Sequence, residues 1–374
     1  MQEDKTSIYL DYNASTPLDP RVAAVIRGLL DQPFGNPSSG HWASSSAKTI
    51  LENARGQVAS LLGAEPDEII FTSGGSEANN LALKGTFFAL RDKGTHIITQ
   101  ATEHPAILKP LKFLEQWGAT VTYLPVDQTG LVDPEAVQQA ITPKTILISV
   151  MHANNETGTL QPIEAIGAIA REHGIRFHTD AAQSIGKVAT RVDDLRVDLL
   201  SIAGHKLYAP KGIGALYIRR GNVMEPLVHG AGHEHGLRAG TESVMLTAAL
   251  GEACMLATDT EPMTRIRELR DYFWEELQRL FGNGVVLNGH ATLRLPNTLN
   301  VSFVGQIGAE VLASLERVAA STGSACHSGR VELSPVLAAM GISEHVGMGA
   351  VRFSLGRGTT RDHIDAVIAQ LRKS

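Results

Sequence analysis

Short apolar segments alternate with segments of helical periodicity between residues 67 and 220. Seven apolar runs have the length of strands, at residues 68–71, 96–99, 121–124, 146–150, 175–178, 199–202 and 214–217. Between the fourth and fifth runs, Ile163, Ile166 and Ala170 recur at helical spacing, and Pro162 suits the first position of that helix. This alternation predicts an α/β fold with a seven-stranded, mainly parallel sheet that helices cover on both faces.

The pattern changes after residue 255. A long amphipathic helix is predicted at 264–281, followed by a strand at 297–303, a helix at 309–318 and a strand at 351–355. These segments predict a smaller α+β domain. We therefore expect a large domain of residues 20–255 and a small domain formed by residues 1–19 together with residues 256–374.

Composition and charge narrow the classes of partner. The 374 residues are 43% hydrophobic and 19% charged, and the formal net charge is −6. No basic block offsets this acidic balance, so neither nucleic acid nor an anionic membrane is expected as a partner. Residues 1–10 contain no apolar signal core and no later stretch reaches membrane-spanning length, so we expect a cytoplasmic protein. A reducing compartment would keep the two cysteines, Cys254 and Cys326, as thiols.

The strongest chemical signal is Gly204-His205-Lys206, which follows a predicted strand and leads into a Gly-containing turn. A lysine desolvated at the end of a buried strand loses its proton more readily, and its amine becomes a nucleophile. Asp180 ends another predicted strand. A lysine that forms an imine and an aspartate that pairs with a pyridine nitrogen are the arrangement of pyridoxal phosphate enzymes. The alternative is a surface lysine and a helix-capping aspartate that never meet.

Two further segments suit a phosphorylated aromatic ligand. Thr72-Ser73-Gly74-Gly75-Ser76 follows a strand and begins a helix, so its small residues let backbone amides approach a phosphate. It is neither a Walker A motif nor a dinucleotide-binding GxGxxG motif, and an ordinary Gly/Ser turn is the alternative. His104 follows the next strand, where its imidazole could lie on a heteroaromatic ring and exchange protons; alternatively it caps a helix.

Three residues suit an amino-acid substrate or a reactive thiol. Asn155 follows the fourth strand, at the edge where α/β sheets bind ligands, although a polar turn has the same character. Arg352 lies in a predicted strand, where a buried guanidinium needs either a substrate carboxylate or a structural ion pair. Cys326 lies among small polar residues, which favours an exposed, reactive thiol, whereas Cys254 is expected in the core. No Cys-x-x-Cys pair occurs to support a metal site.

Several segments also match a known enzyme family in sequence and in order. They are Tyr9-Leu10-Asp11-Tyr12-Asn13-Ala14-Ser15-Thr16, Gly35-Asn36-Pro37-Ser38-Ser39, the Gly74-Gly75 turn, Asn154-Asn155-Glu156-Thr157-Gly158, Arg238-Ala239-Gly240-Thr241, Ser324-Ala325-Cys326 and Arg352-Phe353-Ser354-Leu355-Gly356-Arg357. Over nearly its whole length the chain resembles the NifS/IscS-type cysteine desulfurases. These are class-V aminotransferases that depend on pyridoxal phosphate and have the aspartate-aminotransferase-like fold type I.

The resemblance implies a role for each candidate residue. For pyridoxal 5'-phosphate, Lys206 would hold it as an imine, Asp180 would pair with the ring nitrogen, Gln183 would bind the phenolic oxygen and His104 would stack on the ring. The residues that would hold the phosphate are Gly75, Ser76 and His205, together with Thr241 from the second subunit of a homodimer. The substrate carboxylate would be bound by Arg352 and by Asn155, which also lies at the cofactor. Cys326 would be the nucleophile.

The implied reaction converts L-cysteine to L-alanine and leaves the sulfur as a persulfide on Cys326. An acceptor protein, such as an iron-sulfur cluster scaffold or a sulfur carrier for tRNA thiolation, would then receive it. Two positions depart from the family, because its members often have a hydroxyl residue at Ala203 and a threonine at Ser76. The sequence after Cys326 is also similar to selenocysteine lyases, so release of selenium from L-selenocysteine is the nearest alternative. A same-fold aminotransferase has no use for the thiol, and a catalytically silent partner-binding protein is the alternative from another class.

Overall fold

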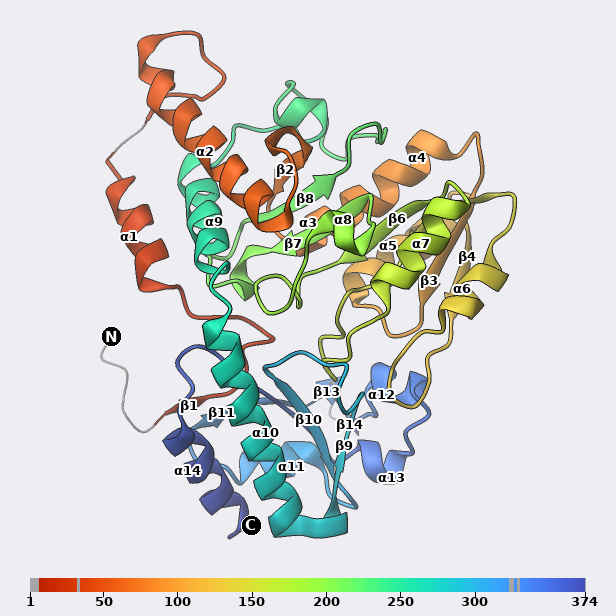
Figure 1. The fold of residues 1–374 in the computed structure, drawn as a ribbon, viewed down its shortest axis with the longest axis vertical. Helices are drawn as coiled ribbons and strands as arrows, with labels where there is room; N and C mark the ends of the chain where they lie inside the picture. Colours follow the sequence, from red (N-terminus) through yellow and green to blue (C-terminus); the bar gives the residue numbers. More distant parts are fainter. Residues whose placement is uncertain (1–6, 32–33, 323–325, 328–329, 374) are drawn as a thin grey trace.

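The computed structural model describes residues 7–31, 34–322, 326–327 and 330–373, and at 326–327 and 330–331 it describes the backbone alone. Its centre is a seven-stranded sheet with the spatial order β2-β8-β7-β6-β5-β3-β4 (Figure 1). The strands are β2 (Ile69–Thr72), β3 (His96–Gln100), β4 (Thr120–Leu124), β5 (Thr145–Ser149), β6 (Arg176–Asp180), β7 (Leu199–Ala203) and β8 (Gly214–Ile218). β8 runs antiparallel to both of its neighbours, and the other pairs are parallel. The predicted α/β fold is confirmed, and each strand lies within two residues of its expected bounds.

Helices cover both faces of this sheet because successive side chains of a strand point to opposite faces. Ile97 and Leu147 join the apolar cluster under α3, α4 and α5, whereas Ile98 and Ile148 join the cluster under α2, α6, α7, α8 and α9. The helices are α1 (Pro20–Gly28), α2 (Ser45–Leu62), α3 (Gly75–Asn80), α4 (Thr86–Leu90), α5 (Pro105–Glu115), α6 (Pro134–Ala140), α7 (Ile163–Glu172), α8 (Val192–Leu195) and α9 (Val244–Leu256). α7 confirms the helix predicted after Pro162, although Pro162 is its cap and not its first residue.

A second, smaller core surrounds an antiparallel sheet of order β12-β15-β10-β9. Its strands are β9 (Val285–Leu287), β10 (Thr298–Phe303), β12 (Ser321–Thr322) and β15 (Ala350–Ser354), and the accompanying helices are α10 (Glu261–Phe281), α11 (Gly308–Ala313), α12 (Pro335–Ala339), α13 (Glu344–Gly347) and α14 (Arg361–Leu371). Phe273 of α10 packs edge-on against Phe353 of β15, with 5.0 Å between ring centroids. Leu10 of the N-terminal arm belongs to the same cluster. The division into domains 20–255 and 1–19 with 256–374 stays a prediction.

The helix predicted at 309–318 is wrong in its length. α11 ends at Ala313, and β11 (Val318–Ala319) instead pairs in parallel with β1 (Ile8–Tyr9). Arg317, which precedes β11, has φ 57°, and a right-handed helix cannot continue through that backbone conformation. This pairing fixes the N-terminal arm, so the residues that follow β1 lie beside the large sheet.

Two short strands complete the fold. β13 (Cys326–His327) and β14 (Arg330–Val331) pair antiparallel, with Cys326 opposite Val331. Among the helices that the structure describes, none is long and apolar enough to cross a membrane.

Candidate active site

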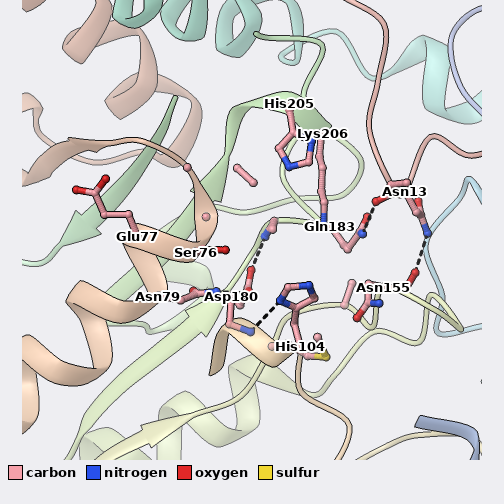
Figure 2. A pocket seen from close by; sticks show the side chains of 18 of the residues that line it. Asn13, Ser76, Glu77, Asn79, His104, Asn155, Asp180, Gln183, His205 and Lys206 are labelled. Atoms are coloured by element: carbon pink, nitrogen blue, oxygen red, sulfur yellow. Dashed lines mark hydrogen bonds between the residues drawn. The ribbon is translucent and has the colours of Figure 1, made fainter. Parts of the chain in front are cut away.

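A cavity of about 480 Å³ lies where the carboxyl ends of the parallel strands meet the smaller core (Figure 2). It gathers predicted site residues from both parts of the chain: Gly75, Ser76, His104, Asn155, Asp180, Gln183, His205, Lys206 and Arg352. Two predicted site residues are not among those that line it. Thr241 lines two other cavities, one of which shares Ser73 with the main cavity, and the side chain of Cys326 lies outside the described residues.

The positions of Lys206 and Asp180 follow from the sheet. β6 and β7 are parallel neighbours, so Asp180 at the end of β6 and the turn Gly204–Lys206 after β7 reach the same edge. Burial lowers the pKa of Lys206, Asp180 opposes this shift, and the charge of Arg352 adds to it. None of the hydrogen bonds or ion pairs of the described residues engages its amine. The alternative of a solvated lysine far from Asp180 is therefore wrong.

The carboxylate of Asp180 is held by two donors. Asn79 Nδ2 donates to one oxygen at 2.7 Å and the backbone N–H of Ala182 donates to the other at 2.9 Å. Because an ionised carboxylate only accepts hydrogen bonds, these donors suit the charged form and fix its orientation. Asn79 is a site residue that the sequence analysis missed. Its spacing of four residues from Gly75 on one helix face is the signal that would have found it.

His104 caps a helix, as the alternative predicted, and it also lines the cavity; its role at a bound ring stays a prediction. Its Nδ1 accepts the backbone N–H of Ala106 at 3.0 Å, at the start of α5. Burial lowers the pKa of the imidazole; Asp180 opposes this shift and Lys206 adds to it. A neutral imidazole that accepts at Nδ1 carries its proton on Nε2, so His104 presents a donor to the cavity and not a base.

The predicted phosphate cradle is the turn at the start of α3. Gly74 has φ 150° and ψ 179°, a region that is essentially restricted to glycine, and it aims the first turn at the cavity. The backbone N–H of Ser73 is already taken by Glu77 at 2.7 Å. The first-turn amides of Gly75 and Ser76 have no partner within the helix and remain as anion donors.

Glu77 places a negative charge beside this cradle, and Arg238 compensates it. The Arg238 guanidinium donates to Glu77 at 2.9 Å. Burial opposes ionisation of Glu77, but its hydrogen bonds with Arg238 and Ser73 outweigh burial and lower its pKa. The ion pair therefore fixes the cradle turn to the 234–243 segment, which also contains Thr241.

A chain of hydrogen bonds fixes the amide of Gln183. Gln183 Nε2 donates to the backbone oxygen of Asn13 at 2.9 Å, and Lys187 Nζ donates to Gln183 Oε1 at 3.0 Å. Burial lowers the pKa of Lys187 to about 7, with further lowering by Lys206 and Arg352. Asn13 and Lys187 were not predicted as site residues. Asn13 lay within the Tyr9–Thr16 segment, but no chemistry was assigned to it.

Arg352 extends from β15 toward the cavity and is almost fully buried. Its Nη2 donates to Asp11 Oδ1 at 2.7 Å and its Nη1 to the backbone oxygen of Asn155 at 2.9 Å. Its Nε is buried without a hydrogen-bond partner in the described structure. The predicted alternative of a structural ion pair is therefore present, while the guanidinium lines the cavity and each Nη keeps one N–H for a further anion.

The cavity fits pyridoxal 5'-phosphate in its donors and charges. Lys206 supplies an amine without a protein partner, Asp180 a fixed carboxylate, and the Gly75 turn free amides. Asn79 Oδ1 is buried without a partner among the described residues, which leaves an acceptor unsatisfied beside Asp180. An aldehyde, a pyridine nitrogen and a phosphate are the groups that these residues complement.

Comparison with known proteins agrees with this assignment. The profile of the aminotransferase class-V family matches residues 8–367. The chain therefore belongs to the class-V aminotransferases, which depend on pyridoxal phosphate.

Comparison with individual relatives indicates which kind of class-V aminotransferase the chain resembles. The cysteine desulfurase IscS of Dictyoglomus turgidum is 48% identical over 374 residues, which cover 99% of this chain and 94% of the relative. A solved NifS-like protein superimposes with a TM-score of 0.92 at 34% identity, covering 98% of this chain and 99% of the other. The structure of SspA in complex with cysteine gives a TM-score of 0.85 at 39% identity, covering 95% and 100%. The predicted fold class, cofactor and cysteine desulfurase function are confirmed.

Proposed function

We propose that the protein takes sulfur from L-cysteine with Cys326 as the receiving thiol. L-Cysteine and the Cys326 thiol become L-alanine and a Cys326 persulfide, so atoms and electrons balance without an external oxidant or reductant. The observation that supports this most strongly is the presence of Lys206, Asp180 and Arg352 around one cavity. An amine, a pyridinium partner and a carboxylate receptor are what an amino-acid reaction with this cofactor needs.

Each residue has a task that follows from its surroundings. When bound, pyridoxal 5'-phosphate supplies the electron sink for the broken Cα–H bond. Lys206, whose pKa is lowered by burial, holds the cofactor and is the base that removes the α-proton of the substrate. His104 stacks on the ring and offers its Nε2–H as a donor, because its Nδ1 is occupied by the helix cap.

The remaining residues orient the two ligands. Asp180, held by Asn79 and Ala182, keeps the ring nitrogen protonated, and Gln183 binds the phenolic oxygen. The turn at Gly75 and Ser76, together with His205, binds the phosphate. Arg352 and Asn155 bind the substrate carboxylate, for which Nη1 and Nη2 of Arg352 each retain one N–H.

We also propose that the protein works as a homodimer in which Thr241 completes the phosphate site of the partner. Thr241 is exposed and borders a cavity of about 370 Å³ lined by Leu30 and Phe34. Phe34 and the neighbouring Trp42 are 82% and 83% exposed, and exposed aromatic side chains of this kind favour a protein interface. A cytoplasmic location and a protein acceptor for the sulfur, such as an iron-sulfur scaffold or a sulfur carrier, are part of the same proposal.

Mass spectrometry after L-cysteine treatment tests the proposal. Wild-type protein is expected to carry one extra sulfur atom on the peptide that contains Cys326, and Cys326→Ala is expected to lose both this sulfur and L-alanine release. Cys254→Ala is the matched control, because Cys254 is fully buried in α9 and burial raises the pKa of its thiol to about 12. Unchanged L-alanine release by Cys326→Ala, or extra sulfur on Cys254, would contradict the assignment.

A second experiment tests Lys206 independently of sulfur transfer. Borohydride reduction of the resting enzyme is expected to fix the cofactor on the peptide that contains Lys206, and Lys206→Ala is expected to retain none. Cofactor fixed on the peptide that contains Lys187, the other buried lysine of the site, would transfer the role to that residue.

A further inference from the structure

One carboxylate oxygen of Asp11 holds two groups at the edge of the cavity. Asp11 Oδ1 accepts Arg352 Nη2 at 2.7 Å and the Ser321 hydroxyl at 2.9 Å. Ser321 and Arg352 lie directly opposite one another in the β12–β15 pair, so both side chains reach the same oxygen from adjacent strands. Asp11 itself is fixed by a bridge to Ser354 of β15.

Asp11 is the principal counter-charge of Arg352. It is the carboxylate in ion-pair contact with that guanidinium among the described residues, and both side chains are largely buried. The other nearby carboxyl, Glu156, accepts the Ser334 hydroxyl at 2.5 Å, and burial raises its pKa. Among the described residues Glu156 is therefore engaged by Ser334 and not in ion-pair contact with Arg352, as Asp11 is.

The guanidinium of Arg352 thus has a permanent anionic partner, Asp11, and is also the group that a substrate carboxylate would contact. Nη1 donates one N–H to the backbone oxygen of Asn155 and Nη2 donates one to Asp11, so each of them keeps a second N–H, whereas Nε is buried and unpaired. An α-carboxylate that approaches Arg352 thus meets a cation whose field is already partly cancelled by a second carboxylate. The attraction between two charges falls when a third, fixed charge of the opposite sign lies beside one of them.

On the basis of the proposed function, we propose that Asp11 is a positioning residue that lowers the affinity of Arg352 for α-carboxylates while holding the guanidinium in the cavity. Substrate and product carry the same α-carboxylate, so a fully unpaired arginine would retain L-alanine as firmly as it attracts L-cysteine. Asp11 weakens both complexes and favours release of the product. Uniform weakening of this kind changes KM and product affinity together, and it does not slow the chemical step.

The test measures the dissociation constant of L-alanine for the cofactor-loaded enzyme by equilibrium titration, without sulfur transfer. Asp11→Asn keeps an acceptor oxygen for Arg352 and Ser321 but removes the charge. It is expected to lower the dissociation constant of L-alanine about three- to tenfold, as for loss of a partly buried counter-charge. KM for L-cysteine is expected to fall with it, while kcat does not rise. A merely structural role would have the opposite sign, because a displaced Arg352 binds L-alanine more weakly.

Two comparisons isolate the charge. Asp19→Asn is the matched control, since Asp19 pairs at 3.2 Å and with similar burial with Arg357, which does not line the main cavity as Arg352 does. Asp19→Asn is expected to leave the L-alanine affinity within about twofold of wild type. Asp11→Glu is expected to do the same, because a glutamate retains the negative charge. In an Arg352→Gln background, Asp11→Asn is expected to have no effect on L-alanine affinity, because Asp11 acts through Arg352.

An unchanged or raised dissociation constant in folded Asp11→Asn overturns the inference. If this variant does not fold, Asp11→Ser also removes the charge, with a smaller neutral side chain that can still accept a hydrogen bond. The same criterion then applies to Asp11→Ser. Failure of the proposed function has a different signature: wild-type protein would hold the cofactor but neither bind L-alanine nor form it from L-cysteine.

Discussion

Ala203 offers a direct test of how the phosphate is held. It is the last residue of β7, 3% exposed, and it lines the cavity. Its Cβ lies 3.1 Å from the place that a Cβ on Gly75 would occupy, so its methyl group faces the cradle turn. The family resemblance implies a hydroxyl residue at this position, and Ala203→Ser would introduce that donor. A hydrogen bond to a charged group contributes about 1.5–3 kcal/mol. The dissociation constant of pyridoxal 5'-phosphate should therefore fall about 10- to 150-fold.

The assay is a titration of cofactor-free protein with pyridoxal 5'-phosphate, followed by absorbance. Ala203→Thr and Ala203→Val have the same shape and crowd Gly75 equally, so the difference between them isolates the hydroxyl. The threonine variant is expected to bind the cofactor more tightly than the valine variant by a similar factor. Equal affinities for these two variants, together with no gain for Ala203→Ser, would refute the reasoning that this methyl group faces the phosphate.

Three further predictions concern charge and backbone strain. The folded pKa of Lys187 is about 7 against an ordinary 10.5, so between these values the unfolded chain holds a proton that the folded protein has released. The free energy of unfolding of the cofactor-free protein should therefore rise with pH in that window, and urea unfolding of Lys187→Met should show a flatter dependence. Asp180→Asn should retain the cofactor but lower kcat about 10²- to 10³-fold, measured as L-alanine release; a kcat near that of wild type would contradict its pairing with the ring nitrogen. Gly74→Ala should lower the free energy of unfolding by about 1–3 kcal/mol, because φ 150° strains any residue other than glycine. The cause is the backbone alone, since no atom lies within 4 Å of the added Cβ. Unchanged urea unfolding would show that the turn relaxes freely.

The large sheet was predictable because each of its strands appears in the sequence as an apolar run of about the same length. The same logic located the chemistry: residues such as Asp180 and Lys206 directly follow such runs, and the parallel sheet brings the ends of neighbouring strands to one edge. The helix expected at 309–318 could not reach residue 318, because Arg317 has a left-handed backbone conformation that no residue type such as Gly or Asn signals at that position.

The supporting polar residues could not be predicted for a different reason. Asn79, Lys187 and Asn13 act through hydrogen bonds to other site residues, and polar side chains leave no periodic pattern that separates a buried partner from a solvated one. Asp11 is the extreme case, since its partner Arg352 is 341 positions away. Such pairs are visible only once the two chain ends have been brought together.

That separation has a consequence for the newly made chain. A ribosome releases the large sheet, with Lys206 and Asp180 in place, well before it has synthesised Arg352. Because Asp11 and Asn13 pair with residues of β15, this wall of the cavity can close only after β15 has been synthesised. A nascent or prematurely terminated chain without Arg352 would thus lack the group that binds the substrate carboxylate. The amine of Lys206 would be present, but no amino acid would be held beside it. We therefore expect activity only in chains in which β15 has been made and has paired with the N-terminal arm.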